Sequence, residues 1–515
     1  MKFIISTLFF LIITSGGKNY SQTLFFEKNG KKLSGNEIVA TIDSINITAI
    51  EFFYSYESGP SFSKRNENSK NTYMKYMIYE KLLALDAYNQ KLIEKDHAKE
   101  MFIDIESDLA SEELFKDEIL SKVKVTEEEI DTVVNQKQIE LELKWLYSIN
   151  KNEIDEYSKL LNEGVTFDSL FHLQINDSIA LDQRQMTISL FDLKKKNPSL
   201  AQIIETLPVG NLSSPIHTDD GWYLVKFDNL IQNLITTEAE LNKLRNESIE
   251  ALTKRKMDYL SDQYVNKLFT EENPIIKRGP FNILRSYFGK RVLSEKKYKE
   301  WELDKKLENA IYNLGLSGHD KYTRINLVEG INKKYSLDEF LNWFWNRELY
   351  IKFSKNNLIE FSNSLENLIW RMVRDKMLAK EAYEKGYYEN DWVKMQSNWW
   401  SDKIAYSALR NKLSNTIGLY AELKKKLDTE EINLSNGNDK TKVLQLNEEL
   451  SKKILYKILE LKEKYKVRVN QDIIDKINVS AENDKKAIDM YIIKNGGLIP
   501  RPAYPAIDND WGSWE

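Results

Sequence analysis

Residues 211–226 read Asn-Leu-Ser-Ser-Pro-Ile-His-Thr-Asp-Asp-Gly-Trp-Tyr-Leu-Val-Lys, and this stretch decides how the middle of the chain is interpreted. It opens as a turn, with Gly210 before it and Pro215 inside it, because glycine and proline interrupt regular structure. Its end, continued by Phe227, is rich in aromatic and β-branched residues, as strands are. The stretch therefore predicts a turn that leads into the final strand of a small domain.

A second strand is predicted farther upstream. Leu141, Leu143, Trp145 and Tyr147 alternate with charged residues, which is the period of a half-buried strand. A helix is expected at about 152–163, followed by further helical segments before the last strand. Strands interleaved with helices in this way predict an α+β domain.

The region resembles a parvulin-type prolyl isomerase domain. In that family a Gly-Glu-Val-Ser turn leads through a proline and a threonine to a Gly-Tyr-His-Ile-Ile-Lys strand. Residues 164–170 are also similar to the family's Gly-x-x-Phe-x-x-Leu turn. Tyr223, however, stands where the family has a histidine. The positions that fit the closing pattern are Gly210, Ser213, Pro215, Thr218, Gly221 and Lys226.

The resemblance also implies where an isomerase site would lie. Active parvulins have a histidine on the first strand, another on the last, and a methionine and a phenylalanine in the proline pocket. These histidines fall at Trp145 and Tyr223, the phenylalanine falls at Leu200, and 185–189 replaces a Gly-Gly-Asp-Leu-Gly stretch. Prolyl isomerisation must lower a rotation barrier of about 18–20 kcal/mol. Since only Thr218 survives from the polar set, we expect a degenerate site and name no catalytic residue.

The substrate-binding groove that the resemblance implies has two open points. His217 lies close in sequence to the lost histidine position and is one candidate to replace it, but a lone histidine beside a turn is more often a surface residue. Trp145 and Tyr223 either line an aromatic groove for extended peptide or fill the space that a lost site leaves. The implied groove positions are Trp145, Leu190, Leu200, His217, Thr218 and Tyr223.

An internal repeat is the clearest signal outside this region. Residues 77–96 and 372–391 align without gaps, with eight identities in twenty positions. Upstream, Thr48-x-x-Glu-Phe is echoed by Ser336-x-x-Glu-Phe. A duplicated helical module is therefore predicted, against the alternative of convergent amphipathic helices. The identities are Met77/Met372, Lys81/Lys376, Leu83/Leu378, Ala84/Ala379, Ala87/Ala382, Tyr88/Tyr383, Glu94/Glu389 and Asp96/Asp391.

These features together resemble the periplasmic parvulin-containing chaperones of the SurA and PrsA type, over about residues 35–280 and weakly over 335–480. The motifs are the Val39 to Phe52 entry, the Lys81-Leu-Leu helix and the Thr126-Glu-Glu-Glu capping box. We expect an α+β multidomain chain with mostly helical modules. The predicted divisions are a helical module at 35–137, a parvulin-like domain at 138–230, a helical return at 231–290, a second helical module at 291–480 and a Pro-rich extended arm at 481–515.

Two helices, at 254–269 and 455–465, each precede a short extended piece, and both are interpreted as chain returning to complete a helical module. The polar segment 435–442 is predicted to be a loop. The C-terminal arm contains prolines that exclude a helix. It is expected to be either a disordered tail or an arm that docks on a partner through Tyr504, Ile507 and Trp511.

Residues 1–21 resemble a secretory signal peptide, and its apolar run is shorter than the roughly 20 residues of a membrane span. No second run of that kind follows, so no membrane span is expected. The chain has no cysteine, hence no disulfide and no acceptor for a lipid anchor. These observations favour a soluble protein exported to the periplasm.

Charge and histidine content indicate which kinds of ligand are not expected. Lysine and arginine total 74 against 79 aspartate and glutamate, a net charge of −5 without a basic stripe, which argues against nucleic acid. His97, His172 and His319 are scattered without metal-ligand spacing, so neither a metal nor another cofactor is expected.

Three functions remain open from the sequence. The first is a periplasmic chaperone with a degenerate isomerase domain, which binds unfolded or extended polypeptide clients. The second is a working prolyl isomerase with an unconventional site. The third is a structural subunit of an outer-membrane secretion or assembly complex, suggested by the duplicated module and the C-terminal arm.

Overall fold

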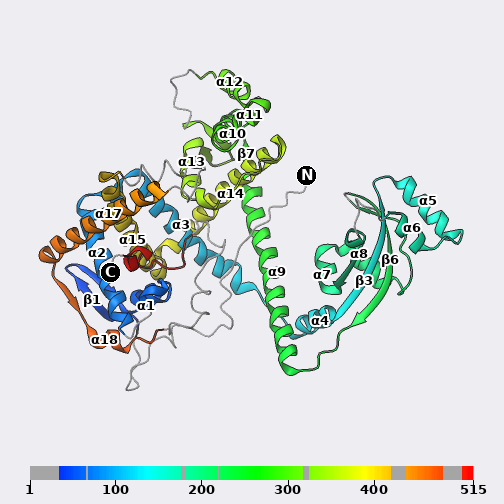
Figure 1. Cartoon of the computed structure of the whole chain (residues 1–515), viewed down its shortest axis with the longest axis horizontal. Helices are drawn as coiled ribbons and strands as arrows, with labels where there is room; N and C mark the ends of the chain where they lie inside the picture. The colour runs from blue at the N-terminus through cyan, green and yellow to red at the C-terminus, as the bar shows by residue number, and fades with distance from the viewer. Residues whose placement is uncertain are drawn as a thin grey trace. The chain divides into compact units, whose positions relative to one another are not determined.

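The computed structural model describes residues 34–64, 68–174, 181–218, 220–316, 324–418, 437–479 and 501–513. The signal peptide predicted at 1–21 and residues 481–500 of the predicted arm lie outside these ranges. The chain divides into two compact units: unit 1 comprises 1–121 and 261–515, and unit 2 comprises 122–260 (Figure 1). The described residues are mostly helical, with small antiparallel sheets, which confirms the predicted α+β class. The module boundaries predicted from the sequence stay predictions.

Unit 2 is built on a four-stranded antiparallel sheet in the order β4-β3-β6-β5. The long central pair places Trp145 opposite Val225 and Tyr147 opposite Tyr223. Because strand residues alternate between faces, the odd-numbered residues of β3 share one side of the sheet, as the sequence pattern predicts. The strands are β3 (Ile139–Ser148), β4 (Gln185–Ser189), β5 (Ile216–Thr218) and β6 (Gly221–Gln232).

Each face of this sheet has its own apolar cluster. On one face α7 (Leu190–Lys196) and α8 (Pro198–Thr206) cover Leu141, Leu143 and Phe227. On the other face α5 (Lys151–Asn162) and α6 (Phe167–Gln174) cover Leu146 and Leu224. The sheet therefore lies between two helical layers over its middle, and only its end is left open to form a site.

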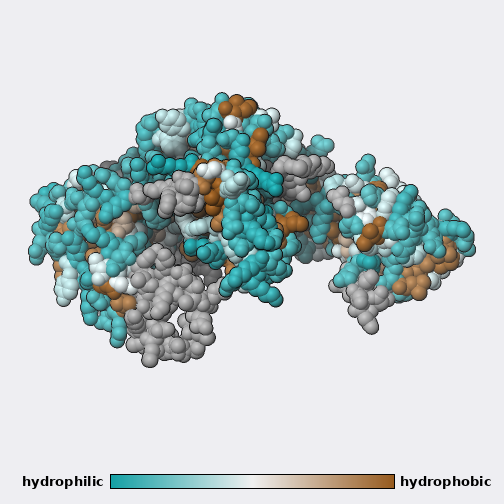
Figure 2. Space-filling model, turned by 90° about the horizontal axis from the view of Figure 1, so that it is seen from above, coloured by the Kyte–Doolittle hydropathy of each residue, from teal (hydrophilic) through white to brown (hydrophobic). Residues whose placement is uncertain are grey.

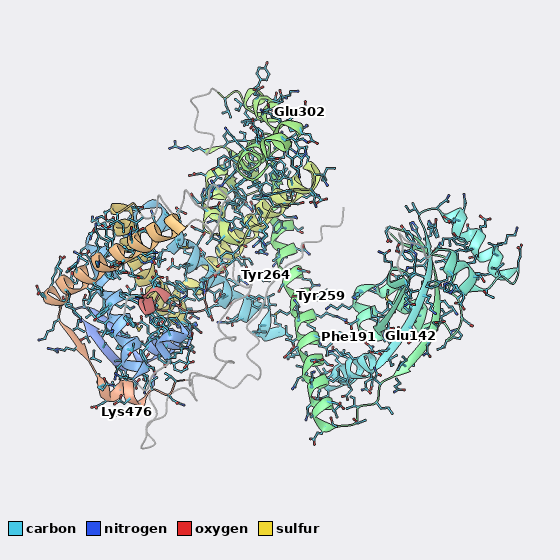
Figure 3. The ribbon with its side chains drawn as sticks, in the orientation of Figure 1. Glu142, Phe191, Tyr259, Tyr264, Glu302 and Lys476 are labelled. Carbon is cyan, nitrogen blue, oxygen red and sulfur yellow. The ribbon has the colours of Figure 1, made fainter. Side chains whose placement is uncertain are left out.

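A third cluster joins α4 (Glu127–Gln138) to the start of α9 (Glu238–Glu272). Ile130, Val133 and Leu252 pack together there, with Phe191 against them (Figure 3). The predicted capping box opens α4, since the Thr126 side chain accepts from the Glu129 amide while the Glu129 carboxylate accepts from the Thr126 amide.

Unit 1 contains the repeat as two copies of one succession of elements: a hairpin, a short helix, a 3-10 turn, a long helix, a second 3-10 turn and another long helix. Thr48 and Ser336 are the N-caps of the short helices, each accepting from a glutamate amide. Copy 1 is β1 (Ile38–Ile42), β2 (Ile45–Thr48), α1 (Ala49–Glu57), η2 (Ser61–Lys64), α2 (Ser69–Asn89), η3 (Leu92–Glu94) and α3 (Asp96–Glu118). Copy 2 is β8 (Asn326–Glu329), β9 (Lys334–Ser336), α13 (Leu337–Trp345), η7 (Glu348–Tyr350), α14 (Leu358–Glu384), η8 (Tyr387–Glu389) and α15 (Asp391–Thr416).

The hairpin of each copy is extended by one further strand from elsewhere in the chain. The strand that follows α9 is β7 (Ile275–Ile276), and it pairs with β8 of copy 2. The strand that follows α17 (Gly437–Lys464) is β10 (Val467–Val469), and it pairs with β1 of copy 1. The two extended pieces predicted to complete helical modules are thereby confirmed as strands, and each adds a third strand to the hairpin of one copy.

The long helices of the two copies pack against each other. The first long helix of copy 1, α2, packs on the second long helix of copy 2, α15, and α3 packs on α14. Ile105 and Leu114 of α3 share one cluster with Leu378 and Trp400 of copy 2. The remaining helices of unit 1 are α10 (Arg278–Val292), α11 (Glu295–Glu300), α12 (Leu303–Asn313) and α18 (Gln471–Lys476).

Two expectations about the C-terminal third need correction. The segment 435–442 was expected to be a loop, but α17 begins at Gly437, because its polar first turns continue into the apolar face formed by Leu450, Ile454 and Ile458. Over residues 501–513 the arm is not a free tail, because its expected anchors Tyr504, Ile507 and Trp511 contact the rest of unit 1.

Hydrophilic side chains predominate on the face shown in Figure 2, and hydrophobic ones form separate spots. Within the described ranges, no helix has the length and apolar character needed to cross a bilayer. The same ranges contain no group of three or more histidine, aspartate or glutamate side chains arranged to hold a metal ion.

Candidate functional site

An open groove with a volume of about 520 Å³ lies at the end of the unit 2 sheet, beside α7 and α8. Residues from β3, β4, β5, β6 and the turns between them form its walls. The lining residues are Leu143, Trp145, Tyr147, Gln183, Arg184, Met186, Ile188, Leu193, Lys196, Asn197, Leu200, Ile216, Thr218, Asp220, Tyr223 and Val225.

The apolar wall comes from strand alternation. Leu143 is buried under the helices, whereas Trp145 and Tyr147 continue the same face of β3 beyond them and stay half-buried. Leu200 on α8 completes this wall, where the Asn197 side chain caps the helix by accepting from the Leu200 amide at 3.0 Å. Partly exposed aromatic and aliphatic surface of this kind suits the side chains of an extended peptide.

A polar network occupies the mouth of the groove. The Tyr223 hydroxyl donates to Asp220 Oδ2 at 2.6 Å, and the Thr218 hydroxyl donates to Asp220 Oδ1 at 2.5 Å. The Tyr147 hydroxyl donates to the Asp220 carbonyl at 2.6 Å, and its ring lies 5.0 Å from that of Tyr223. One turn residue therefore gathers the three hydroxyl groups of the groove.

This network shifts the acidities of its members. The hydroxyl groups of Thr218 and Tyr223 donate to the Asp220 carboxylate and lower its pKa below the usual value. Partial burial, together with the bond to Asp220, raises the pKa of Tyr223. The groove therefore presents an anion at Asp220 beside a neutral Tyr223 at neutral pH, and the Tyr223 hydroxyl proton is already engaged.

A cation lies on the other side of Tyr147. The Arg184 guanidinium stacks 5.2 Å from the Tyr147 ring centre, and one of its nitrogens donates to the Gln183 carbonyl at 3.1 Å. Its Nε is buried and has no hydrogen-bond acceptor among the described residues. Arg184 and Asp220 thus place opposite charges at the two sides of one tyrosine.

Of the six residues expected at the groove, the structure brings four together: Trp145, Leu200, Thr218 and Tyr223. Leu190 is instead buried in the core at the start of α7, beneath the groove rather than on its wall. His217 is exposed and packs 4.5 Å from the Trp222 ring.

The position of His217 follows from its strand. Ile216 and Thr218 line the groove, and alternation along β5 turns the residue between them to the opposite face. Asp220, Arg184 and Tyr147 were not expected as site residues. The Asp-Gly pair of the β5–β6 turn is a common turn signal, which concealed the role of Asp220 as the acceptor of the network.

No family model and no curated protein matches the chain. Among solved structures, it is similar to a peptidylprolyl isomerase (PrsA) from Bacillus cereus at 16% identity, covering 55% of this chain and 99% of that one with a TM-score of 0.24. PrsA from Bacillus subtilis is 17% identical, and the match covers 44% of this chain and 93% of that one with a TM-score of 0.17. One of the SurA-like chaperones PEB4 and Cj1289 of Campylobacter jejuni is 15% identical. That match covers 48% of this chain and 97% of the other one with a TM-score of 0.21.

The chain resembles PrsA and SurA-like chaperones. The two strand positions where the sequence comparison places histidines hold Trp145 and Tyr223. Both residues line the groove, so the space is open rather than filled by them.

We expect Gly221→Ala to destabilise unit 2 by about 2–3 kcal/mol. Gly221 has φ +151°, and a Cβ there would lie 2.7 Å from the Tyr147 ring and 2.9 Å from the Ser148 carbonyl oxygen. Gly210→Ala is the control, since φ is +86° but no atom lies within 4 Å of the added Cβ, so only backbone strain of about 1 kcal/mol is expected. Hydrogen exchange of β3 and β6 amides measures both, and equal effects would contradict the steric argument.

Proposed function

We propose that this chain is a chaperone that binds extended polypeptide, and that the groove of unit 2 is a peptide site without prolyl isomerase activity. The observation that carries the proposal is the composition of the groove. Its wall is aromatic and aliphatic, and its hydroxyl groups are bonded to Asp220 instead of being available to a peptide. Such a surface favours binding through side chains over chemistry on the peptide backbone.

The alternative of a working isomerase rests on the polar residues of the same groove. Catalysis needs a pocket for the proline ring and polar groups that favour the twisted amide, at a cost of about 18–20 kcal/mol for the uncatalysed rotation. Thr218, Asp220 and Tyr223 are polar groups in the groove. In the structure, however, the hydroxyl groups of Thr218 and Tyr223 both donate to Asp220, and His217 faces away.

We therefore expect the mature chain, residues 22–515, to isomerise a proline-containing test peptide no faster than the uncatalysed reaction. A Trp145→His/Tyr223→His variant provides the comparison, because it restores the expected residue types. Clear acceleration by the wild-type chain would overturn the proposal, and Thr218→Ala and Asp220→Asn would then identify the groups responsible.

Binding is tested separately, with a fluorescent extended peptide rich in aromatic residues. Leu200→Glu places a charge on the groove wall and should weaken binding at least about tenfold, since an unpaired carboxylate opposes apolar contact. Leu173→Glu is the matched control, because Leu173 lies in the same unit and is 78% exposed. Unchanged binding by Leu200→Glu would exclude the groove as the peptide site.

The proposal includes the compartment. The signal-like segment 1–21 and the lack of cysteine support export to the periplasm, and clients there would be exported or outer-membrane proteins. The mass of the protein recovered from that compartment tests this point, with removal of the first 21 residues as the expected result.

A fixed subunit of an outer-membrane secretion or assembly complex is the second candidate, supported by the duplicated module. The arm no longer supports it over residues 501–513, because its aromatic anchors contact unit 1. Recovery of the chain in a stable membrane complex after gentle solubilisation would favour this candidate over a free chaperone.

A further inference from the structure

Residues 501–513 lie in a seat on unit 1 whose contacts follow a fixed order of charges. At the start of the segment, the Arg501 guanidinium bonds to Asp108 Oδ2 at 3.0 Å and to Glu112 Oε1 at 2.8 Å, both on α3. The Arg501 side chain is 4% exposed and that of Asp108 is fully covered. The first part of the seat is therefore acidic and accepts a cation.

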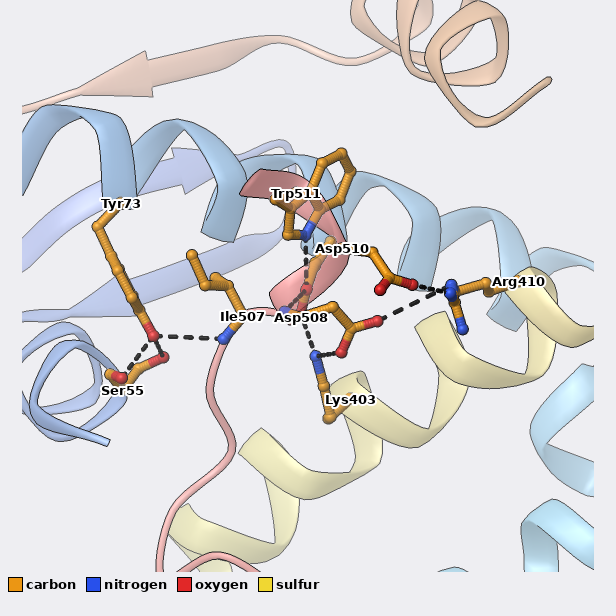
Figure 4. A network of polar contacts seen from close by, with 9 residues as sticks. Ser55, Tyr73, Lys403, Arg410, Ile507, Asp508, Asp510 and Trp511 are labelled. Atoms are coloured by element: carbon orange, nitrogen blue, oxygen red, sulfur yellow. Dashed lines mark hydrogen bonds and ion pairs between the residues drawn. The ribbon is translucent and has the colours of Figure 1, made fainter. Parts of the chain in front are cut away.

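The middle of the seat is aromatic. The Tyr504 ring stacks 4.2 Å from that of Tyr54 and meets Trp392 edge-on at 6.1 Å. The Ile507 amide donates to the Tyr73 hydroxyl at 3.3 Å (Figure 4). Residues 505–507 leave only a small cavity of about 30 Å³ against unit 1, so the segment fills its seat closely.

The end of the seat carries two cations beside the buried Glu80 carboxylate, and it holds two carboxylates and a tryptophan of the segment. Lys403 Nζ lies 2.6 Å from Asp508 Oδ1, and Arg410 pairs with Asp510 (Figure 4). Both cations come from α15. The segment thus carries a cation, then proline and aromatic residues, then carboxylates, and the seat carries the complement in the same order.

Trp511 is the most buried anchor of the segment. Its side chain is 1% exposed, its ring stacks 5.2 Å from Tyr76, and its Nε1 donates to Glu80 Oε1 at 2.9 Å. The Asp508 amide donates to the same Glu80 oxygen at 2.8 Å. A buried aromatic anchor surrounded by directed polar contacts is how peptide-recognition sites hold a ligand.

The segment is attached to unit 1 mainly by side chains. Residues 501–508 form no helix or strand, and the backbone contacts described above are single hydrogen bonds rather than a ladder. If the segment leaves, Glu112, Lys403 and Arg410, whose side chains are already partly exposed, lose a partner, and the fully covered Asp108 loses Arg501. The electrostatic cost of opening the seat therefore falls mainly on Asp108, because the other three charges already reach water.

We propose that this seat is a second peptide-binding site, occupied in the chain by its own C-terminal segment as an exchangeable ligand. Its external ligands are extended polypeptide segments in which a cation precedes proline and aromatic residues, followed by carboxylates and a tryptophan. The segment then regulates access, since a client must displace it. This inference does not depend on the groove of unit 2, which lies in the other unit.

The test uses the full chain with a protease recognition sequence inserted between residues 490 and 491. After cleavage, a fluorescent peptide of residues 501–513 is added in excess. We expect it to replace the cleaved segment at least about tenfold faster than unit 1 unfolds. Exchange only at the unfolding rate would show that the segment is an integral part of the core and would overturn the proposal.

Peptide variants test the recognition. A peptide with Trp511→Ala should compete at least about thirtyfold less well, the loss typical of a buried aromatic anchor. A peptide in which Arg501 and Asp508 are interchanged should also fail, although its composition is unchanged. Equal competition by all peptides would contradict a seat that reads the order of charges.

An uncleaved chain provides an independent measurement. Full-length Trp511→Ala should bind the labelled wild-type peptide, whereas the wild-type chain should bind it at least about tenfold more weakly because its own segment competes. Adding Lys403→Ala should remove this binding, and adding Lys394→Ala should not, because Lys394 lies on the same helix but is 52% exposed and pairs with Glu389. Binding that ignores Lys403 would place the peptide elsewhere and reject the seat.

Discussion

Replacing Lys81 by alanine is expected to lower the free energy of unfolding of unit 1 by about 3–5 kcal/mol. Lys81 pairs with Glu51 and lies 2.5 Å from Asp402 Oδ2, and the three side chains are 8%, 5% and 17% exposed. Burial opposes the charge on Lys81, but the two carboxylates outweigh it and raise its pKa. Without the ammonium, two adjacent carboxylates would stay buried and uncompensated.

The repeat supplies the control. Lys376 is the equivalent residue of copy 2, but it is 25% exposed and lies 3.7 Å from Asp104. Lys376→Ala should therefore cost less than about 1 kcal/mol. Trp145→Phe/Trp222→Phe chains, in which every remaining tryptophan lies outside 122–260, report unit 1 by fluorescence during urea unfolding. Equal losses for Lys81→Ala and Lys376→Ala would refute the argument from burial.

Arg347→Ala should destabilise unit 1 by about 3 kcal/mol. Arg347 Nη1 bonds to Asp104 Oδ2 at 2.8 Å and to the Trp343 carbonyl at 2.9 Å, and the guanidinium lies 4.6 Å from the Trp343 ring centre. It joins copy 2 to α3 of copy 1. Its loss leaves Asp104 buried with weaker partners, because the nearest other cation is Lys376.

Arg291→Ala is the control for Arg347→Ala, because Arg291 also pairs with a carboxylate and lies near a tryptophan ring. Arg291 bonds to Glu348 at 2.9 Å and lies 4.7 Å from the Trp345 ring centre, yet it is 44% exposed. We expect a loss below about 1 kcal/mol, since water replaces an exposed ion pair. The same fluorescence unfolding curves measure both variants, and a loss of the same size at Arg291 would count against burial as the cause.

Much of the fold could be predicted from local patterns. The alternation at Leu141 to Tyr147 marks β3 because one face of that strand is covered, and the repeat marks two copies of one succession of elements. Which copy each closing strand joins was not predictable. β7 and β10 have two and three residues, too few to carry a register preference, and their partners are decided by packing of the whole unit.

The candidate site was predictable in part for a similar reason. Trp145, Leu200, Thr218 and Tyr223 meet in one groove because they belong to the strands and helix that the pattern identifies. Leu190 and His217 do not, because a shift of one position along a strand or into a helix changes the face that a side chain occupies. Asp220 and Arg184 lie in turns, where a sequence pattern does not specify contacts.

The pairing of β1 with β10, which lies near the other end of the chain, constrains how this protein reaches its folded state. Ile42 pairs with Val467, so the first hairpin to be synthesised waits for nearly the whole chain before its sheet is complete. Contacts so distant in sequence slow folding, and the unpaired edge of β1 is open to incorrect pairing during that time. We therefore expect unit 1 of the newly made chain to fold late, and to depend on protection from aggregation until its C-terminal region has arrived.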